Sequence, residues 1–411
     1  MSKITQKIKQ LFLVLTLATP FMAVSCFNSS NLNEWDQELT IYAPQPNPGF
    51  SEEDKTNWEK TLTNYFNETK NNISSLKNKP NVSVKLEFAS DRSALYPKFL
   101  ANNSTNDFVI MSYTDLVDVS EEDLLPSVAQ SQTIKFLWTP DKPVHFENKK
   151  ENDPLYLMAQ NANKIQLENS NYGTYPLDWI NNEKKLKWDG SKYEVFYKLG
   201  SYTENYYGSI LISGTEEQRE QIKQAWINKD WDTFRSFGIV FDSSDSLAKF
   251  NLPASLIAKN FNLKYSDIVN YLIKQPNDLV SLGNVPESSL GVQTSTGKVY
   301  RIAFEYDGVF NWTPPTWTPD SASKSYNFKP TNYPNEQVRY LTMSGPLLYD
   351  AVLARKGISK EQIDIFAQAL EKLTYEENTY GIYSGFNKFV KMSDKELLTK
   401  YSTLKEMLKH E

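Results

Sequence analysis

The chain has 411 residues, 40% of them hydrophobic and 13% aromatic, which is enough to bury large cores and excludes a protein that is disordered throughout. The formal net charge of −6, without a long Lys/Arg block in the body, disfavours binding to nucleic acid through its phosphates. With one cysteine and two histidines, the chain cannot form an internal disulfide, and neither a Cys/His zinc site nor a Ser-His-Asp triad is favoured.

The first 26 residues are typical of a bacterial lipoprotein signal. Lysines at positions 3, 7 and 9 precede LFLVLTLATPFMAV, which is too short and too interrupted for a transmembrane helix. The residues AVSC at 23–26 then resemble a lipobox, in which the cysteine carries the lipid, such as palmitate, of the mature protein. We predict a signal peptide over 1–25, lipidation at Cys26 and a polar tether over 26–37, with the protein anchored at the extracellular face of the membrane. The alternative is a secretory signal with an incidental cysteine.

The first part of the body predicts alternating strands and helices. Hydrophobic residues at Trp58, Leu62 and Phe66 follow the helical period, and VSVKLEF alternates as a strand does. This order argues for an α/β protein with a parallel sheet covered by helices. We expect strands at 39–43, 83–89 and 106–117, and helices at 53–71 and 91–103.

Residues 120–200 are rich in Asn, Lys, Pro and Tyr with little periodicity, and we interpret them as an elaborated loop region. The β/α pattern then restarts, with a capping box from Thr215 to Gln218 at the start of one helix. Two series separated by a break predict two lobes, with chain crossings near 200 and 340. We expect strands at 206–213, 234–241, 297–306 and 338–355, helices from 215, 247, 359 and 393, lobe 1 at 38–200 and 340–411, and lobe 2 at 201–339.

The turn FDSSDS at 241–246 precedes a predicted helix and crowds Ser243, Ser244 and Ser246 together. The first N–H groups of a helix lack internal partners and carry partial positive charge, so added hydroxyls could complete an anion site. The alternative is that the serines only cap the helix, because serine and aspartate are also the commonest caps. The two aspartates in the turn argue against a multiply charged anion unless they face away.

Aromatic residues gather near predicted strand ends. Tyr206 and Tyr207 open one strand, while Asp307, Trp312 and Trp317 follow another. Rings there can stack on a flat ligand or face a cation, and the aspartate can neutralise a cationic group. The alternative is packing within a large loop. Together with the serine turn, this pattern hints at a ligand that carries both signs of charge.

Three segments of the chain then resemble a known family. IKQAWINKDWDTFRSFGIVFDSSDSLAKF, RIAFEYDGVFNWT and GPLLYDAVLARKGIS are similar to segments of the extracytoplasmic substrate-binding lipoproteins of mycoplasma ABC transporters, which bind thiamine pyrophosphate. This group lies within the phosphonate-binding-protein family of the type II periplasmic-binding fold. The resemblance implies two lobes with a ligand cleft between them and two hinge crossings. Where the wider family often has DPxSxSG, this chain has DSSDSL, which puts the phosphate geometry there in doubt.

Carried over by position, the resemblance implies a set of ligand contacts. Phosphate contacts are expected from Ser243, Ser244 and Ser246, ring or cation contacts from Asp307 and Trp312, and weaker lobe 1 contacts from Gln45, Ser112 and Tyr113. The aromatic pattern adds Tyr206 and Tyr207 to the expected ring or cation contacts. No catalytic residue and no metal ligand is predicted.

The predicted function is therefore a substrate-binding lipoprotein of an ABC importer, with an ABC permease as partner and thiamine or thiamine pyrophosphate as the transported ligand rather than a cofactor. One alternative ligand is a phosphonate or another phosphorylated metabolite. Another alternative is a surface adhesin that uses the same scaffold. The fold also hosts thiaminases, whose nucleophile is a cysteine, but the only cysteine here is Cys26, far in sequence from every cleft motif. We therefore expect that the protein is not an enzyme.

Overall fold

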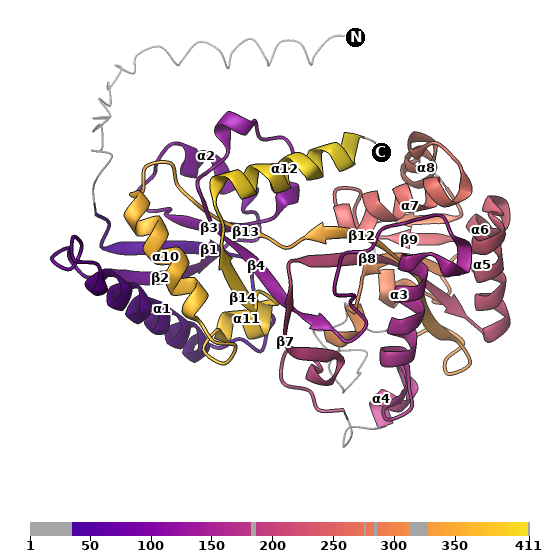
Figure 1. The fold of residues 1–411 in the computed structure, drawn as a ribbon. Coiled ribbons are helices and arrows are strands. Elements are labelled where there is room, and N and C mark those ends of the chain that lie inside the picture. Colours follow the sequence, from indigo (N-terminus) through magenta and orange to yellow (C-terminus); the bar gives the residue numbers. More distant parts are fainter. Residues whose placement is uncertain (1–34, 182–185, 275–276, 283–285, 313–327, 410–411) are drawn as a thin grey trace, which may run out of the picture.

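The computed structural model describes residues 35–181, 186–274, 277–282, 286–312 and 328–409 (Figure 1). The predicted signal peptide, Cys26, most of the tether and Trp317 lie outside these residues. Within the described part of the chain, no helix is both long enough and apolar enough to cross a membrane.

Two mixed β-sheets form the centres of two lobes that lie side by side (Figure 1). The sheet of lobe 1 has the order β14-β4-β13-β3-β1-β2, with β7 paired to β4, and the sheet of lobe 2 has the order β10-β9-β11-β8-β12. The strands of lobe 1 are β1 (Glu38–Ala43), β2 (Ser83–Phe88), β3 (Phe108–Met111), β4 (Ser127–Phe136), β7 (Tyr197–Thr203), β13 (Ala351–Ala354) and β14 (Lys388–Lys391). Those of lobe 2 are β8 (Asn205–Gly214), β9 (Ile239–Phe241), β10 (Val280–Leu282), β11 (Ile302–Tyr306) and β12 (Gln337–Leu348), with the small hairpin β5 (Glu168–Asn169) and β6 (Gly173–Thr174) beside them.

Helices pack around both sheets (Figure 1). Lobe 1 contains α1 (Glu52–Asn72), α2 (Tyr96–Leu100), α10 (Lys360–Lys372), α11 (Thr379–Ser384) and α12 (Asp394–Lys409). Lobe 2 contains α3 (Pro154–Ala162), α4 (Leu177–Asn181), α5 (Glu216–Asn228), α6 (Trp231–Ser236), α7 (Leu252–Phe261), α8 (Tyr265–Ile273) and α9 (Pro286–Ser289). Short helical turns are η1 (Ser93–Leu95), η2 (Tyr113–Leu116), η3 (Glu121–Asp123), η4 (Lys150–Asn152), η5 (Asn163–Leu167), η6 (Glu194–Phe196), η7 (Leu247–Asn251) and η8 (Val309–Trp312).

Helix α1 shows how local sequence builds these elements. Ser51 and Asp54 form a capping box that satisfies free N–H groups at the start of the helix. Trp58, Leu62 and Phe66 recur at the helical period, and all three are fully buried against the sheet and α10. The predicted helix and its buried face are therefore confirmed, as are the capping box at Thr215 and the strands that became β1, β2 and β8.

A buried ion pair ties three strands of lobe 1 together. The Nε of Arg355 lies 3.0 Å from a carboxylate oxygen of Asp107, and the other carboxylate oxygen accepts a 2.8 Å hydrogen bond from the Thr40 N–H. Asp36 and Asn102 accept the remaining guanidinium hydrogen bonds. Because these residues come from or flank β1, β3 and β13, the network fixes the alignment of strands that are distant in sequence.

The interpretation of 120–200 as a loop region was wrong, since it contains β4, α3 and β7. The sequence pattern did not reveal β4, because the strand buries polar residues that a hydrophobic pattern does not mark. For example, the side-chain amide of Gln130 donates to the carbonyl of Tyr349 at 2.7 Å. Within this region, the buried hydrophobic side chains from Trp138 to Phe196 pack in the core of lobe 2. This packing favours a lobe boundary near 137, whereas the predicted boundary at 200 rests on the sequence pattern alone.

Four predicted elements are shorter than expected. The strands predicted at 106–117 and 297–306 are reduced to β3 and β11. Only 239–241 of the predicted strand at 234–241 is extended, because Asp230 caps α6 by accepting a hydrogen bond from the Thr233 N–H at 3.0 Å. The predicted helix at 91–103 is reduced to η1 and α2. The expected parallel sheet is mixed in both lobes, since β12 and β13 run antiparallel to their neighbours.

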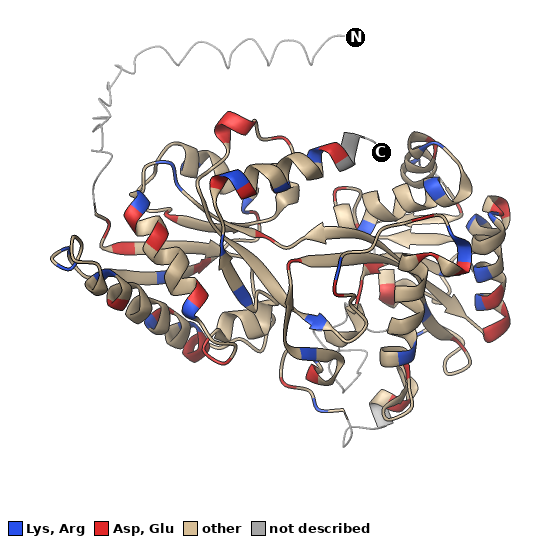
Figure 2. Cartoon of the chain, viewed as in Figure 1, with Lys and Arg blue, Asp and Glu red and all other residues tan. Residues whose placement is uncertain are grey.

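The chain crosses between the lobes after β4, before β7, where β7 leads into β8 and where β12 leads into β13. The last two connections are tied together, because the Tyr349 N–H donates to the carbonyl of Glu204 at 2.8 Å. Acidic and basic residues are mixed along α1 and α5, so neither helix presents a face of one sign (Figure 2).

Candidate functional site

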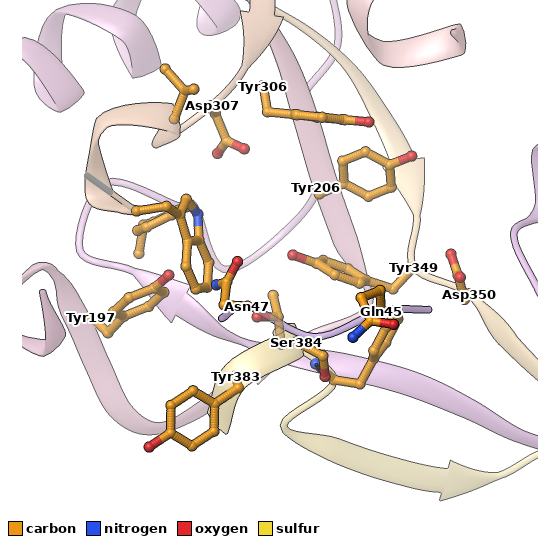
Figure 3. Close-up of a pocket in the computed structure, with 15 residues that line it drawn as sticks. Gln45, Asn47, Tyr197, Tyr206, Tyr306, Asp307, Tyr349, Asp350, Tyr383 and Ser384 are labelled. Atoms are coloured by element: carbon orange, nitrogen blue, oxygen red, sulfur yellow. Dashed lines mark hydrogen bonds between the residues drawn. The ribbon is translucent and has the colours of Figure 1, made fainter. Parts of the chain in front are cut away.

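A cavity of about 310 Å³ lies between the two lobes, and residues of both line it (Figure 3). Tyr306 and Asp307 lie on one side of it, opposite Gln45 and Ser384. The lining residues are Gln45, Asn47, Thr133, Phe136, Tyr197, Tyr206, Tyr306, Asp307, Val309, Trp312, Tyr349, Asp350, Tyr383, Ser384 and Phe386.

Aromatic rings form most of the cavity wall, since eight of the fifteen lining residues are aromatic. Tyr206 connects several of them: its ring centroid lies 6.0 Å from that of Tyr306 and 5.1 Å from that of Tyr349. The Tyr349 ring in turn lies 6.2 Å from Phe386 in an edge-to-face arrangement. Such tilted ring contacts hold the side chains of this wall in place.

Two carboxyl groups face this aromatic wall. Burial raises the pKa of Asp307 to about 7, and Asp307 is only 7% exposed. Burial also raises the pKa of Asp350 to about 6, although Arg92, 3.1 Å away, opposes this shift. No lysine or arginine is found among the described lining residues, so the cavity wall itself is suited to a cation.

The turn after β11 explains how Asp307 reaches the cavity. The Asp307 N–H donates to the carbonyl of Tyr207 at 3.1 Å, which continues the pairing of β11 with β8. Gly308 follows with φ of +66°, and a Cβ at this position would lie 2.2 Å from the ring of Phe136. Glycine therefore permits both the turn and the close approach of β4 from the other lobe.

Lobe 1 supplies the opposite wall through the loop after β1 and through α11. The Asn47 N–H donates to the carbonyl of Tyr383 at 2.9 Å, which holds this loop against the helix. The same helix is held by the segment at 191–192, where the Ser191 hydroxyl and the Lys192 ammonium both donate to the carbonyl of Ile382, at 3.1 and 3.0 Å. Lys192 is 1% exposed, and burial lowers its pKa. The segment at 191–192 is therefore hydrogen-bonded to α11.

Four of the predicted contact residues meet in this cavity: Gln45, Tyr206, Asp307 and Trp312. Tyr207 does not line it; its hydroxyl accepts a hydrogen bond from the Val144 N–H at 3.0 Å.

Two further residues predicted from lobe 1 also lie elsewhere. Ser112 caps η2 by accepting a hydrogen bond from the Thr114 N–H, and the Tyr113 hydroxyl donates to Gln130 at 2.8 Å. Their hydrogen bonds within lobe 1 support a structural role.

The three predicted phosphate ligands do not line the cavity either. Ser246 accepts a hydrogen bond from the Lys249 N–H at 3.1 Å, and Ser243 accepts one from the Asp245 N–H at 3.2 Å. Ser244 is exposed. The hydrogen bonds thus match the capping alternative, and a contact of these serines with phosphate stays a prediction.

Sequence reasoning missed most of the lobe 1 wall and the connection at 349–350. One signal was present, because the dipeptide Tyr-Asp occurs in two of the segments singled out above, at 306–307 and at 349–350. Both pairs line the cavity. Asn47, Tyr383 and Ser384 carry no comparable local signal, since polar residues beside turns are common on any surface.

Comparison with known proteins identifies the family. A family model described as "Extracytoplasmic thiamine-binding lipoprotein" matches residues 56–403, which is most of the chain. The chain belongs to this family. The predicted resemblance to the extracytoplasmic lipoproteins of mycoplasma solute transport is thereby confirmed.

Relatives and a solved structure agree with this family. The high affinity transport system protein p37 of Mesomycoplasma hyorhinis is 26% identical over 418 residues, covering 96% of this chain and 98% of the relative. The p37 of Mycoplasma pneumoniae is 29% identical over 231 residues, covering 54% and 58% of the two chains. The solved structure of the M. hyorhinis protein Mh-p37, which its title describes as a proposed thiamine pyrophosphate transporter, is 25% identical with a TM-score of 0.74, covering 90% of this chain and 99% of that one.

These matches confirm the two-lobed periplasmic-binding-protein fold and make this family member an extracytoplasmic substrate-binding protein of a transport system. The relatives are transport and binding proteins, a class that is generally not enzymatic.

Proposed function

We propose that the protein binds thiamine, or a phosphate ester of thiamine, in the interlobe cavity and delivers it to an ABC permease. The observation that carries this proposal is the buried carboxyl group of Asp307 beside an aromatic wall that has no described lysine or arginine. Thiamine joins a cationic thiazolium ring to a flat aminopyrimidine, so the carboxylate of Asp307 can balance its charge while the rings stack on it. The description of the family and that of the Mh-p37 structure support the same ligand class, thiamine and its pyrophosphate.

The same wall bears on the phosphorylation state of the ligand. A diphosphate tail near Asp307 would meet a like charge, and no cation is found among the described lining residues to offset it. We therefore propose that unphosphorylated thiamine binds most tightly.

Calorimetric titration with thiamine, its monophosphate and its pyrophosphate tests this order. We expect affinity to fall as phosphates are added. Affinity that rises with phosphate count would contradict the order and favour a tail at Ser243–Ser246. If none of the three binds but an alkylphosphonate does, thiamine is not the ligand.

The affinity for thiamine is expected to rise between pH 6 and pH 8. Burial raises the pKa of Asp307 to about 7, so at pH 6 this carboxyl group is neutral in most molecules. It must lose its proton before it can form an ion pair with the thiazolium. A single such proton gives at most about a tenfold change per pH unit below that pKa. Dissociation constants measured at pH 6, 7 and 8 and at constant ionic strength check this. A constant affinity, or tighter binding at pH 6, would exclude Asp307 as the counter-charge.

We also propose that Cys26 carries a lipid anchor at the extracellular face of the membrane, as is usual for the lipoproteins of the family. The intact mass of the mature membrane-bound protein checks the modification. The function proposed is binding without turnover, so thiamine incubated with the protein should be recovered unchanged.

A further inference from the structure

A partly buried cluster of charges lies behind the cavity wall, between the serine turn at 242–246 and β11. The Lys249 Nζ lies 3.1 Å from an oxygen of Asp242 and 3.2 Å from an oxygen of Glu305. The side chain of Lys249 is 18% exposed and that of Glu305 only 1%. None of these three residues lines the cavity. The cluster therefore does not contact a ligand there directly.

The cluster does hold Tyr306, which lines the cavity. One oxygen of Glu305 bonds Lys249, while the other accepts a 2.9 Å hydrogen bond from the Tyr306 N–H. The Lys249 Nζ also lies 5.4 Å from the centre of the Tyr306 ring. Glu305 thus fixes the backbone of Tyr306, and the ammonium that it binds contacts the ring of the same residue. Such a cation beside an aromatic ring is attractive.

A second carboxyl group beside Glu305 makes Lys249 indispensable to this arrangement. Glu287 is 1% exposed, and burial, followed by the charge of Glu305, raises its pKa to about 9, so it is neutral near pH 7. Burial raises the pKa of Glu305 as well, and the charge of Lys249, whose Nζ lies 3.2 Å away, opposes that shift. Lys249 is the cation that compensates a charge on Glu305, since among the described residues no other ion pair to Glu305 is found.

We propose that Lys249 is a positioning residue for ligand binding, which holds the Tyr306 ring on the cavity wall through its contacts with Asp242 and Glu305. In this proposal the turn at 242–246 holds Lys249 in place. Asp242 binds the Lys249 ammonium, and the Ser246 hydroxyl accepts a hydrogen bond from the Lys249 backbone N–H. Because Tyr306 also packs against Tyr206, a displaced ring would disturb the wall further along the cavity. This inference rests on the proposed function only for the identity of the probe, thiamine.

A double-mutant cycle with thiamine tests the inference. We expect Lys249→Met to weaken binding about tenfold, which corresponds to about 1.4 kcal/mol, and Lys249→Arg to restore part of the loss. In a Tyr306→Ala background, Lys249→Met should cause less than a twofold further loss, because the ring it positions is absent. Lys298→Met is the matched control, since Lys298 pairs with Asp278 in the same lobe and lies outside the cavity. Wild-type affinity in Lys249→Met, or losses that multiply in the double variant, would overturn the proposal.

A ligand-free measurement separates this inference from the proposed function. Fluorotyrosine placed at position 306 gives a ¹⁹F resonance whose shift and width report the environment of the ring. We expect Lys249→Met to shift and broaden this resonance without ligand, and Lys298→Met to leave it unchanged. An unaltered resonance in Lys249→Met would overturn the positioning role even if thiamine binds. Failure of the wild type to bind thiamine, with the resonance altered as expected, would defeat only the choice of ligand.

Discussion

Replacement of Asp307 by asparagine is expected to weaken thiamine binding about 30- to 100-fold, or about 2–3 kcal/mol, because a hydrogen bond or ion pair to a buried charge contributes this much. The asparagine side chain would keep the shape and the turn before Gly308 but could not neutralise the thiazolium. Calorimetry at pH 8, where the carboxylate is ionised, gives the largest difference. The control is Asp278→Asn, which removes an exposed carboxylate of the same lobe outside the cavity.

The same substitution should stabilise the ligand-free protein at pH 8. Burial raises the folded-state pKa of Asp307 to about 7, so the folded state retains a proton that the unfolded chain loses at lower pH. Its contribution to stability therefore declines as pH rises from about 4 through about 7, and asparagine removes this decline. Urea unfolding at pH 4 and pH 8 should show a gain only at pH 8. Weak binding combined with lower stability at pH 8 would instead indicate a damaged fold.

Replacement of Arg355 by methionine is expected to lower the free energy of unfolding by about 3–5 kcal/mol at pH 8, because it leaves the buried Asp107 carboxylate without its cation. Asp107 is 0% exposed, and burial already raises its pKa to about 6 despite Arg355. At pH 5 the carboxyl of the variant can take up a proton, so the loss should be smaller there. Urea titrations at both pH values measure the difference.

Two further variants separate charge from packing in this network. Adding Asp107→Asn to Arg355→Met should recover part of the lost stability, since no buried charge remains. Lys391→Met removes an exposed ion pair with Asp364 in the same lobe and should cost less than about 1 kcal/mol. An equal loss at pH 5 and pH 8 for Arg355→Met would show that packing, rather than the buried charge, dominates.

Local signals predicted the elements that depend on local chemistry. The start of α1 at Ser51 and its buried Trp58 follow from capping and helical periodicity within a few residues. Strand β4 could not be predicted in this way, because the polar side chain of Gln130 is buried. Its hydrogen-bond partner lies more than two hundred residues away in the sequence. No local pattern distinguishes such a residue from one on a solvent-exposed loop.

The candidate site divides in the same way. Asp307 and Trp312 were predicted because they follow a recognisable strand, and both line the cavity. The partners in lobe 1, such as Tyr383, depend on how two lobes approach, which no short segment encodes. The serine turn shows the limit most clearly, since a cap and an anion site use the same residues and only the orientation of the turn separates them.

The bridge from Lys192 to the carbonyl of Ile382 requires no ligand atom, and its acceptor belongs to the main chain. This contact between the two lobes therefore forms from protein atoms alone, and a change of side chain at 382 would leave the acceptor in place. Separation of the lobes would have to break it, whichever ligand the protein binds. If the lobes must separate before a ligand enters, the observed binding rate in rapid mixing with the proposed ligand, thiamine, should level off at high thiamine concentration rather than increase in proportion to it.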